Sequence, residues 1–424
     1  MSLVLGFAAA AAAHDQDDPL GALQADEFAA TVASASAHVP RSDERCTNGY
    51  AGEFPCDGID LLSFVPLDQL GATFVNDIWG WSDAVTRHEY ALVGAAEGTV
   101  FVDVTTPHRP VVLGILPTHS TDGGEFWRDI KVYADHAFVV SEYEDHGMQV
   151  FDLTELRGLG PADGYQVFAE TAHYGGIGHS HNVAINEATA YAYIVGSDDC
   201  AGGLHMVDIS NPGGPAFAGC FVDDGYTHDT QCVTYHGPDL DYYGNELCFS
   251  SNANFDDTPF LNTLSIVDVT DKSNPIGIAN VEYADDGYSH QGWLTEDHAQ
   301  FLHGDELDEL FFANPTRTRI WDVTDLDNPS VIGVFDNTTA AIDHNIYIEG
   351  NTAFASNYTS GLRLYDTSQV AAGVLTEVGY FDVYPENDNA SFEGGTWSNY
   401  PFFTKADLVA VTGMDRGLFL LAAR

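Results

Sequence analysis

The sequence is poor in basic residues, and this scarcity excludes two classes of partner. Its 424 residues include only 14 Lys and Arg against 64 Asp and Glu, which gives a formal charge of −50. Binding to nucleic acid or to an anionic membrane surface needs clustered cations, so neither is expected as a partner. A charge this negative suits a protein that stays soluble in salt or one that collects cations.

The sequence also lacks the short motifs of common catalytic sites. It contains no GxSxG elbow, no P-loop, no GxGxxG after a strand, no HExxH helix and no CxxCH haem attachment. A serine or cysteine nucleophile therefore has no support. Whether the protein is an enzyme stays open at this point.

Long hydrophobic runs are missing after the N-terminus, so no transmembrane segment is expected. The run from Leu3 to Ala13 is too short to cross a bilayer and ends in small residues, as a secretory signal does. Because no basic residues precede it, we interpret residues 1–13 as a signal-like segment that has lost its start. Residues 14–45 are predicted to form an acidic linker.

The six cysteines favour export as well, because disulfides persist in oxidising compartments. Two of them bracket a short loop, and the other four lie near the ends of strands that would pair antiparallel. This local spacing predicts three disulfides: Cys46–Cys56, Cys200–Cys220 and Cys232–Cys248. We therefore expect an exported protein that is periplasmic, secreted or at the cell surface.

One pattern recurs along the chain and predicts the fold. It is a β-branched or aromatic strand that ends in Asp, then a Thr/Ser–Asn–Pro turn and another apolar strand. Its clearest copies are "GTVFVDVTTPHRPVVLGIL" (98–116), "GLHMVDISNPGGPAFAGCF" (203–221), "TLSIVDVTDKSNPIGIANV" (263–281) and "TRIWDVTDLDNPSVIGVF" (318–335). In "DVTTP" and its copies, we expect Asp or Thr to bond its own backbone.

The spacing of these units indicates an all-β, seven-bladed β-propeller over residues 46–424 as a single domain. A strand pair precedes each copy, and the units recur about every 50 residues. The equivalent first-strand positions are Asp77, Asp129, His181, Thr230, His290, His344 and Thr396. The last unit has only three strands, so we expect the N-terminal strand "GIDLLSFVPL" (58–67) to complete it and close the ring.

The repeat resembles the LVIVD repeat, and residues 46–422 resemble the choice-of-anchor B family of bacterial propellers. The stretches that carry this resemblance are "GHSHNVAI", "THDTQCVTYHGPD", "YSHQGWLTEDH", "GDELDE" and "GTWSNYPFF". The resemblance implies a propeller that is secreted or attached to the surface. It implies no settled activity. Members commonly carry a C-terminal anchor, and this sequence ends after its last strand, so we expect free secretion or a periplasmic location.

Histidines open several of the predicted first strands, which line the channel of a propeller. We expect them to converge at one mouth of the channel on a metal ion or a small ligand. The candidate metal ligands are His179, His181, His228, His290, His344, Asp77 and Asp129. The residues expected around them are Asn182, Asp229, Gln231, Gln291, Asp343 and Asn345. Five other histidines are expected at the surface or in loops: His88, His108, His205, His236 and His303.

Imidazoles with carboxylates suit zinc, copper, iron, nickel or manganese. The alternative is a wet channel in which these polar groups bond only solvent and backbone. Calcium is a second candidate cofactor because several acidic clusters offer hard oxygen ligands, although acidic turns would look the same. These clusters are "GDELDE" (304–309), "NANFDDTP" (252–259) and "YPENDNAS" (384–391).

These features leave three functions open. The first is a non-catalytic module that binds a small ligand or a protein at the mouth of the propeller. The second is a metal-dependent oxidoreductase or lyase, by analogy with the histidine-lined funnels of copper-dependent methanethiol oxidases and manganese-dependent oligogalacturonate lyases. The third is a periplasmic metal-delivery protein. The oligomeric state is not predicted.

Overall fold

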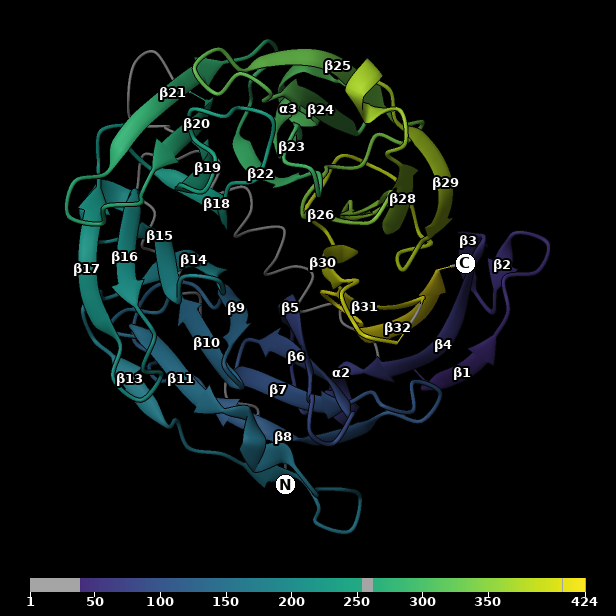
Figure 1. The fold of residues 1–424 in the computed structure, drawn as a ribbon. Coiled ribbons are helices and arrows are strands. Elements are labelled where there is room, and N and C mark those ends of the chain that lie inside the picture. Colours follow the sequence, from purple (N-terminus) through teal and green to yellow (C-terminus); the bar gives the residue numbers. More distant parts are fainter. Residues whose placement is uncertain (1–38, 254–261, 406, 424) are drawn as a thin grey trace.

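The computed structural model describes residues 39–253, 262–405 and 407–423. Seven antiparallel sheets surround a central axis, so the predicted all-β, seven-bladed propeller is confirmed (Figure 1). The signal-like segment 1–13, most of the expected linker and most of the cluster "NANFDDTP" lie outside the described residues. Within the described part of the chain, no helix is long and apolar enough to span a membrane.

The first four blades contain four strands each, from the axis outwards. Blade 1 contains β5 (Val75–Ser82), β6 (Glu89–Ala95), β7 (Gly98–Asp103) and β8 (Val111–Pro117), with β12 (Gln166–Val167) beside β8. Blade 2 contains β9 (Arg128–Tyr133), β10 (His136–Ser141), β11 (Met148–Asp152) and β13 (Ala172–Tyr174), with η1 (Leu153–Leu156) after β11. Blade 3 contains β14 (Ser180–Asn186), β15 (Tyr191–Ser197), β16 (Leu204–Asp208) and β17 (Ala216–Phe221), with η2 (Cys200–Gly202) before β16. Blade 4 contains β18 (Thr227–Thr234), β19 (Glu246–Asn252), β20 (Thr263–Asp268) and β21 (Ile276–Glu282).

Of the last three blades, blades 6 and 7 include the strands from the N-terminal part of the chain. Blade 5 contains β22 (Ser289–Leu294), β23 (Gln300–Asp305), β24 (Arg317–Asp322) and β25 (Ser330–Asp336), with α3 (Asp308–Phe312) after β23. Blade 6 contains β26 (Ile346–Glu349), β27 (Thr352–Ser356), β28 (Leu362–Asp366) and β29 (Thr376–Phe381), extended by β3 (Phe54–Asp57) and β2 (Tyr50–Ala51), with η3 (Val370–Ala372) after β28. Blade 7 contains β30 (Thr396–Tyr400), β31 (Leu408–Gly413), β32 (Gly417–Ala423), β4 (Ile59–Pro66) and β1 (Arg41–Glu44), with α2 (Leu67–Leu70) after β4.

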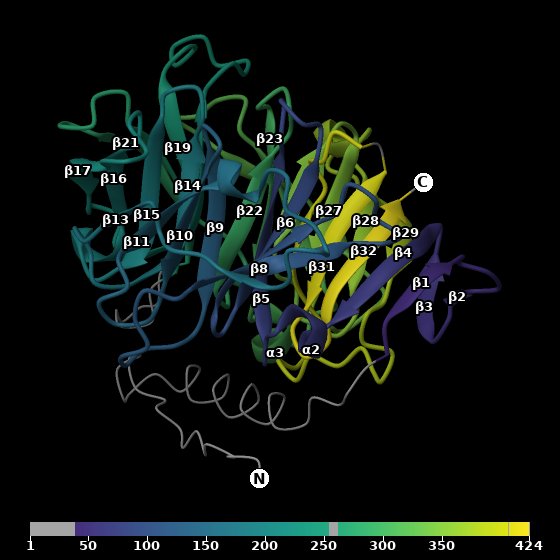
Figure 2. The ribbon, with the colours of Figure 1, turned by 90° about the horizontal axis from the view of Figure 1, so that it is seen from below.

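The ring closes as predicted, because β4 pairs antiparallel with β32 in blade 7. The purple and yellow ends of the chain meet there in Figure 1. β1 pairs with β4 on its outer side, so Arg41–Glu44, within the range expected as a linker, belong to the sheet. Both α2 and α3 lie at the face of the ring where the first strands begin (Figure 2).

The strand-ending Asp of the repeat has the turn role that the sequence predicts. In six blades its carboxylate accepts a hydrogen bond from the backbone N–H two residues later, which sets the turn into the fourth strand. These residues are Asp103, Asp152, Asp208, Asp268, Asp322 and Asp366.

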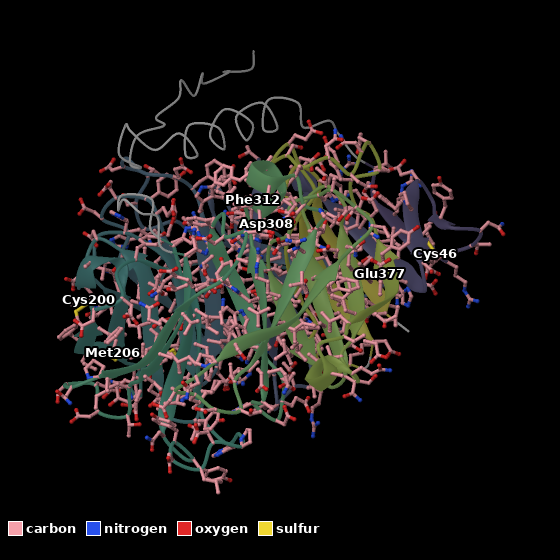
Figure 3. The ribbon with its side chains drawn as sticks, turned by 90° about the horizontal axis from the view of Figure 1, so that it is seen from above. Cys46, Cys200, Met206, Asp308, Phe312 and Glu377 are labelled. Carbon is pink, nitrogen blue, oxygen red and sulfur yellow. A yellow bond between two sulfur atoms is a disulfide. The ribbon has the colours of Figure 1, made fainter. Side chains whose placement is uncertain are left out.

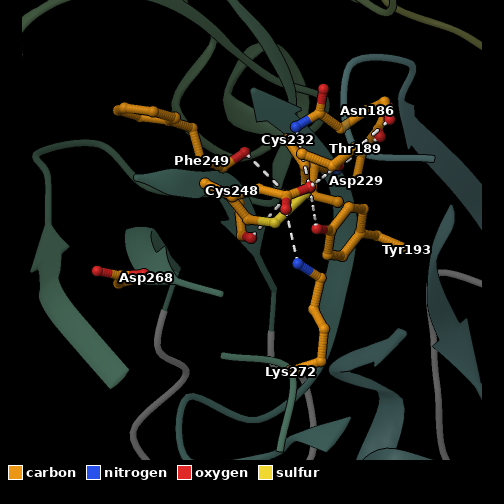
Figure 4. The surroundings of a disulfide bond; sticks show 12 residues. Asn186, Thr189, Tyr193, Asp229, Cys232, Cys248, Phe249, Asp268 and Lys272 are labelled. Atoms are coloured by element: carbon orange, nitrogen blue, oxygen red, sulfur yellow. Dashed lines mark hydrogen bonds and ion pairs between the residues drawn. A yellow bond between two sulfur atoms is a disulfide. The ribbon is translucent and has the colours of Figure 1, made fainter. Parts of the chain in front are cut away.

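All three predicted disulfides are present: Cys46–Cys56, Cys200–Cys220 and Cys232–Cys248. Cys46 and Cys200 lie at opposite edges of the ring (Figure 3). The Cys232–Cys248 disulfide joins β18 to β19 beside a buried ion pair between Lys272 and Glu246 at 2.6 Å (Figure 4).

Candidate metal centre on the propeller axis

Four imidazoles from four consecutive blades lie next to one another near the axis. The ring centroids of His181 and His228 are 4.2 Å apart, and those of His228 and His290 are also 4.2 Å apart. The ring of His344 follows at 4.3 Å from His290. Blades 3, 4, 5 and 6 therefore each place one histidine at the start of the first strand or just before it. We call these four residues the histidine row.

Two tryptophans extend the histidine row. The ring of Trp397 in blade 7 lies 4.4 Å from His344 and stacks on Trp127, which precedes β9 of blade 2, at 4.5 Å. Both tryptophans belong to an apolar cluster at the face that carries α2 and α3. Its buried members come mainly from the segments before the first strands and from the loop and helix that follow β23. They include Phe74, Tyr288, Leu307, Ile342, Tyr358, Phe392 and Met414. This cluster packs against the histidine row, because the ring of Tyr288 lies 5.1 Å from that of His228 and the ring of Tyr358 lies 4.9 Å from that of His344.

Backbone groups of neighbouring blades fix the tautomers of two of these histidines. Nδ1 of His228 lies 2.8 Å from the backbone oxygen of His290, and Nδ1 of His344 lies 2.5 Å from the backbone oxygen of Trp397. A carbonyl only accepts, so Nδ1 carries the proton in both rings and the lone pair lies on Nε2. Metal-binding histidines are commonly oriented in this way.

Two glutamates complete the set: Glu142, which is half-buried, and Glu306, which is buried. The sequence placed neither beside the histidines, although Glu306 belongs to the acidic cluster "GDELDE". Glu142 hydrogen-bonds Nδ1 of His181. The carboxylate of Glu306 lies 3.7 Å from Nε2 of His290 and 3.8 Å from Nε2 of His344, and it accepts a hydrogen bond from Tyr358 at 2.7 Å. One ligand atom each from His290, Glu306 and His344 lie within 4.8 Å of one another. These three residues are therefore placed to share one ion.

Burial sets the charge of the row. It lowers the pKa of His290 well below its ordinary value and that of His344 to about 3, so both rings are neutral at pH 7 and in the form that binds metals. Burial also lowers the pKa of His181, but the Glu142 carboxylate outweighs this effect and the pKa is raised overall. Burial raises the pKa of Glu306 to about 7.

A small cavity on the axis adjoins the row and has room for about one water molecule or ion. Its lining residues are Asp77, Trp127, Arg128, His181, Asn182, His228, His290, His344, Asn345 and Trp397. The four histidines of the row thus line one small cavity together with two of the predicted amides.

Two aspartates expected as metal ligands join the first strands of neighbouring blades. Oδ2 of Asp77 accepts a hydrogen bond from the backbone N–H of Ile130 at 3.3 Å, and Oδ2 of Asp129 accepts one from that of Val183 at 2.8 Å. Asp129 also pairs with Lys131 at 2.5 Å. In this arrangement both carboxylates hold blades together, although Asp77 also lines the cavity.

Asp229 belongs to the same buried group of charges. Burial, followed by the nearby Asp129 carboxylate, raises its pKa to about 7, and the same two causes raise the pKa of Asp77 well above its ordinary value. Lys131 lowers the pKa of both. The group therefore shares protons and does not present three full negative charges to the axis.

Four predicted amides bond the next blade. Oε1 of Gln231 accepts from the backbone N–H of Leu294, and Oε1 of Gln291 accepts from that of Ile346, both at 2.8 Å. Asn182 donates to the backbone oxygen of His228 at 3.0 Å, and Asn345 donates to Ser398 at 3.2 Å. All four amides therefore form contacts between blades, and two of them, Asn182 and Asn345, also line the cavity beside the histidine row.

Two further candidates lie away from the histidine row. His179 precedes β14, and its Nδ1 is 3.6 Å from Glu144. The Asp343 carboxylate lies against Gly304, beside the buried carboxyl groups of Asp308 and Glu309. Neither residue lines the axial cavity.

Comparisons with known proteins support the fold. Residues 177–223 and 260–282 match the LVIVD repeat. The first segment spans blade 3 and the second contains β20 and β21 of blade 4. No curated protein matches the chain.

Two solved structures are similar to this chain. A protein from Lactobacillus plantarum has 14% sequence identity and a TM-score of 0.50, with 80% of this chain and 89% of that chain covered. The β-propeller domain of Cps50 (Swd1) from Myceliophteria thermophila has 14% identity and a TM-score of 0.49, with 79% of this chain and 93% of that chain covered.

The repeat also explains how Glu142 and Glu306 could have been found. Each residue directly follows the second strand of its blade, β10 for Glu142 and β23 for Glu306. The second strand runs antiparallel to the first, so its end lies beside the start of the first strand. Aligning the ends of the second strands would have placed both carboxylates near the histidines.

Two histidines that were expected at the surface or in loops are buried, and this expectation was wrong. His205 and His303 are 1% and 0% exposed. His205 bonds Tyr174 at 2.8 Å, and His303 bonds Ser289 at 3.0 Å. His205 lies on β16 and His303 on β23, the middle strands of their blades, where hydrogen-bonded partners compensate for the burial of the imidazole.

Proposed function

We propose that the protein is an exported binding module whose histidine row holds a transition-metal ion, such as zinc or copper. One observation carries this proposal: four imidazoles from successive blades line one small cavity, and Glu142 and Glu306 lie beside them. Imidazoles with a carboxylate are a typical ligand set for such ions. The three disulfides support export.

The ligand atoms of the row favour a metal over a simple packing role. Nε2 of His290 and Nε2 of His344 face the Glu306 carboxylate at 3.7 and 3.8 Å, which is beyond hydrogen-bond distance. A buried polar group without a partner costs about 1–3 kcal/mol. A metal ion shared by these two nitrogens and Glu306 would offset this cost.

Enclosure favours binding over catalysis. A metal-dependent oxidoreductase or lyase needs a ligand position that a substrate can reach. His228, His290 and His344 are only 4%, 2% and 4% exposed, and the apolar cluster packs against them. An ion held there is better placed to be retained than to turn over a substrate. The partner would then bind the outer surface of the propeller, a fold often used for binding.

The test is elemental analysis of the oxidised, untagged protein. We expect about one zinc or copper ion per chain, and its loss in the variant His290→Ala/His344→Ala. The matched control is His236→Ala/His298→Ala, which removes two histidines that stack on each other away from the axis. It should keep the ion. Metal-free protein whose melting temperature does not change with added zinc or copper would overturn the proposal.

A further inference from the structure

A second group of buried acids lies off the axis, in and beside α3. Asp308 and Glu309 begin this helix, and Asp343 precedes the first strand of blade 6. Their exposed fractions are 0%, 3% and 5%. Figure 3 labels Asp308 near the face of the ring that carries α3. The group is separate from the histidine row because none of the three residues lines the axial cavity.

Each of the three carboxyl groups has one oxygen without a hydrogen-bond partner among the described residues. These atoms are Oδ1 of Asp308, Oε2 of Glu309 and Oδ1 of Asp343. One ligand oxygen from each residue lies within 4.8 Å of the other two. Three buried carboxyl groups thus converge, and each has one oxygen that accepts no hydrogen bond from the described residues.

The positive charges near these three carboxyl groups do not neutralise them. Arg319 bonds the other oxygen of Asp308 at 2.7 Å, and the backbone N–H of Arg317 bonds Glu309 at 3.2 Å. The adjacent Asp305 carboxylate is already satisfied by other donors of blade 5, including Tyr283 at 2.6 Å. Buried charges without a partner are expensive, so an additional positive charge or protons must be present.

Two glycines allow close approach at this group, Gly304 to the Asp343 carboxylate and Gly287 to the backbone that leads into α3. A Cβ at Gly304 would lie 2.1 Å from Oδ2 of Asp343, so only glycine lets that carboxylate approach β23. A Cβ at Gly287 would lie 2.8 Å from both Oδ1 of Asp305 and the backbone nitrogen of Asp308. The backbone is therefore shaped around the acidic group.

We propose that Asp308, Glu309 and Asp343 form a calcium site that fastens α3 to the start of blade 6. Calcium takes carboxylate oxygens at about 2.4 Å, so two ligands on opposite sides of the ion lie about 4.8 Å apart. The observed spacing meets this limit. An all-oxygen set selects a hard cation, unlike the imidazoles of the histidine row. The site falls in "GDELDE", which the sequence left open between calcium and an acidic turn.

Calcium at this position would also stabilise the apolar cluster that packs against the histidine row. The segment that supplies Asp308 and Glu309 also supplies Glu306, which lies beside His290 and His344. Leu307 and Leu310 of the same segment pack in the apolar cluster. An ion that holds the start of α3 in place would therefore also hold Glu306 and part of the apolar cluster in place.

Protons are the competing way to neutralise the group. Burial raises the pKa of Asp308 to about 7 and the pKa values of Glu309 and Asp343 well above their ordinary range. Without a cation the three carboxyls would therefore keep protons near neutral pH. The two alternatives predict opposite effects of replacing a carboxylate by an amide.

The experiment uses the full oxidised chain, stripped with EGTA and then titrated with calcium alone. We expect about one calcium ion per chain by equilibrium dialysis and a rise of several degrees in the melting temperature. The isosteric variant Asp308→Asn/Asp343→Asn should lose both effects. Glu309→Gln is a milder change and should weaken calcium binding at least tenfold. Circular dichroism should show that this variant is folded.

Two controls isolate the site. Asp325→Asn/Asp327→Asn makes the same charge change in an exposed acidic trio and should keep the calcium response. His290→Ala/His344→Ala should keep it too, so failure of the axial metal proposal would leave this one standing. Wild-type protein that binds no calcium, with an Asp308→Asn/Asp343→Asn variant that melts at or above wild type, would overturn the proposal in favour of protons. A calcium response that survives in that variant, or equal binding of magnesium, would overturn it as well.

Discussion

Backbone carbonyls of the next blade, and not side chains, orient two of the axial imidazoles. His228 donates to the backbone of blade 5, and His344 donates to the backbone of blade 7. These acceptors exist only when adjacent blades are in register. The ligand geometry of the histidine row is therefore a consequence of blade packing, and a disturbance of that packing would disturb the site before any histidine changed.

A buried ion pair gives a pH-dependent contact between blades 1 and 2. Arg157 donates to both oxygens of Asp83, at 2.8 and 2.9 Å. This bonding lowers the pKa of Asp83 well below its ordinary value. The contribution to stability is therefore complete above the unfolded-chain pKa of about 3.9 and declines as the pH falls below it. We expect Asp83→Asn to lower the melting temperature by about 2–4 °C at pH 7.

The difference between wild type and Asp83→Asn should shrink steadily between about pH 4 and pH 2, as differential scanning calorimetry can show. Asp135→Asn is the control, because Asp135 is an exposed second partner of the same arginine, at 3.5 Å. It should change the melting temperature little at any pH. An Asp83→Asn difference that persists unchanged at low pH would contradict the assignment.

At the scale of the strand, a glycine in the outer strand marks where blades touch. A Cβ at Gly219 of β17 would lie 1.8 Å from the backbone oxygen of Lys272 in the next blade. A Cβ at Gly333 of β25 would lie 2.2 Å from the backbone oxygen of Gly373. The glycine of the repeat is thus required by close approach of two backbones, and not by its own conformation.

Gly219→Ala should therefore destabilise the protein by about 1–3 kcal/mol, because backbone cannot move aside as a flexible side chain can. The matched change is Gly277→Ala in β21, where the Cβ would meet only the ring of Phe221 at 3.4 Å. It should cost much less. Urea unfolding of both variants measures the difference, and equal losses would refute the close-approach account.

The strands show how far the sequence could predict this molecule. Local patterns were sufficient for the Asp turns, the three disulfides and the closing strand, because each depends on residues close in sequence or on an unpaired edge. They were insufficient for Gln231, Gln291 and Asp129, whose acceptors or donors lie on the next blade and depend on its register. Glu142 and Glu306 were missed for the same reason, because only the fold brings the ends of second strands beside first strands.

At the scale of the whole molecule, the excess of acidic residues is distributed in two ways. Some carboxylates pair with the few cations, as Asp83 does with Arg157 and Glu246 does with Lys272. Others are buried in groups that outnumber their cations, on the axis around Lys131 and at α3 around Arg319. The negative charge is therefore internal as well as external, which connects the composition with the cation sites proposed above.

Ring closure is the property that depends on the whole chain, and truncation of the N-terminal strands tests it. Phe64 of β4 is buried and stacks on Phe419 of β32 at 4.4 Å. A chain that begins at Leu67 loses this strand together with β1–β3 and the Cys46–Cys56 disulfide, and it exposes the edges of β32 and β29. We therefore expect aggregation and a melting temperature lower by more than about 10 °C. Size-exclusion chromatography with light scattering and calorimetry measure both effects.

A chain that begins at Val39 keeps all the described strands and should stay monodisperse. A synthetic peptide of residues 58–67 should restore part of the loss, because it supplies the missing strand. A truncated chain that melted like the longer one would show that the ring holds without closure.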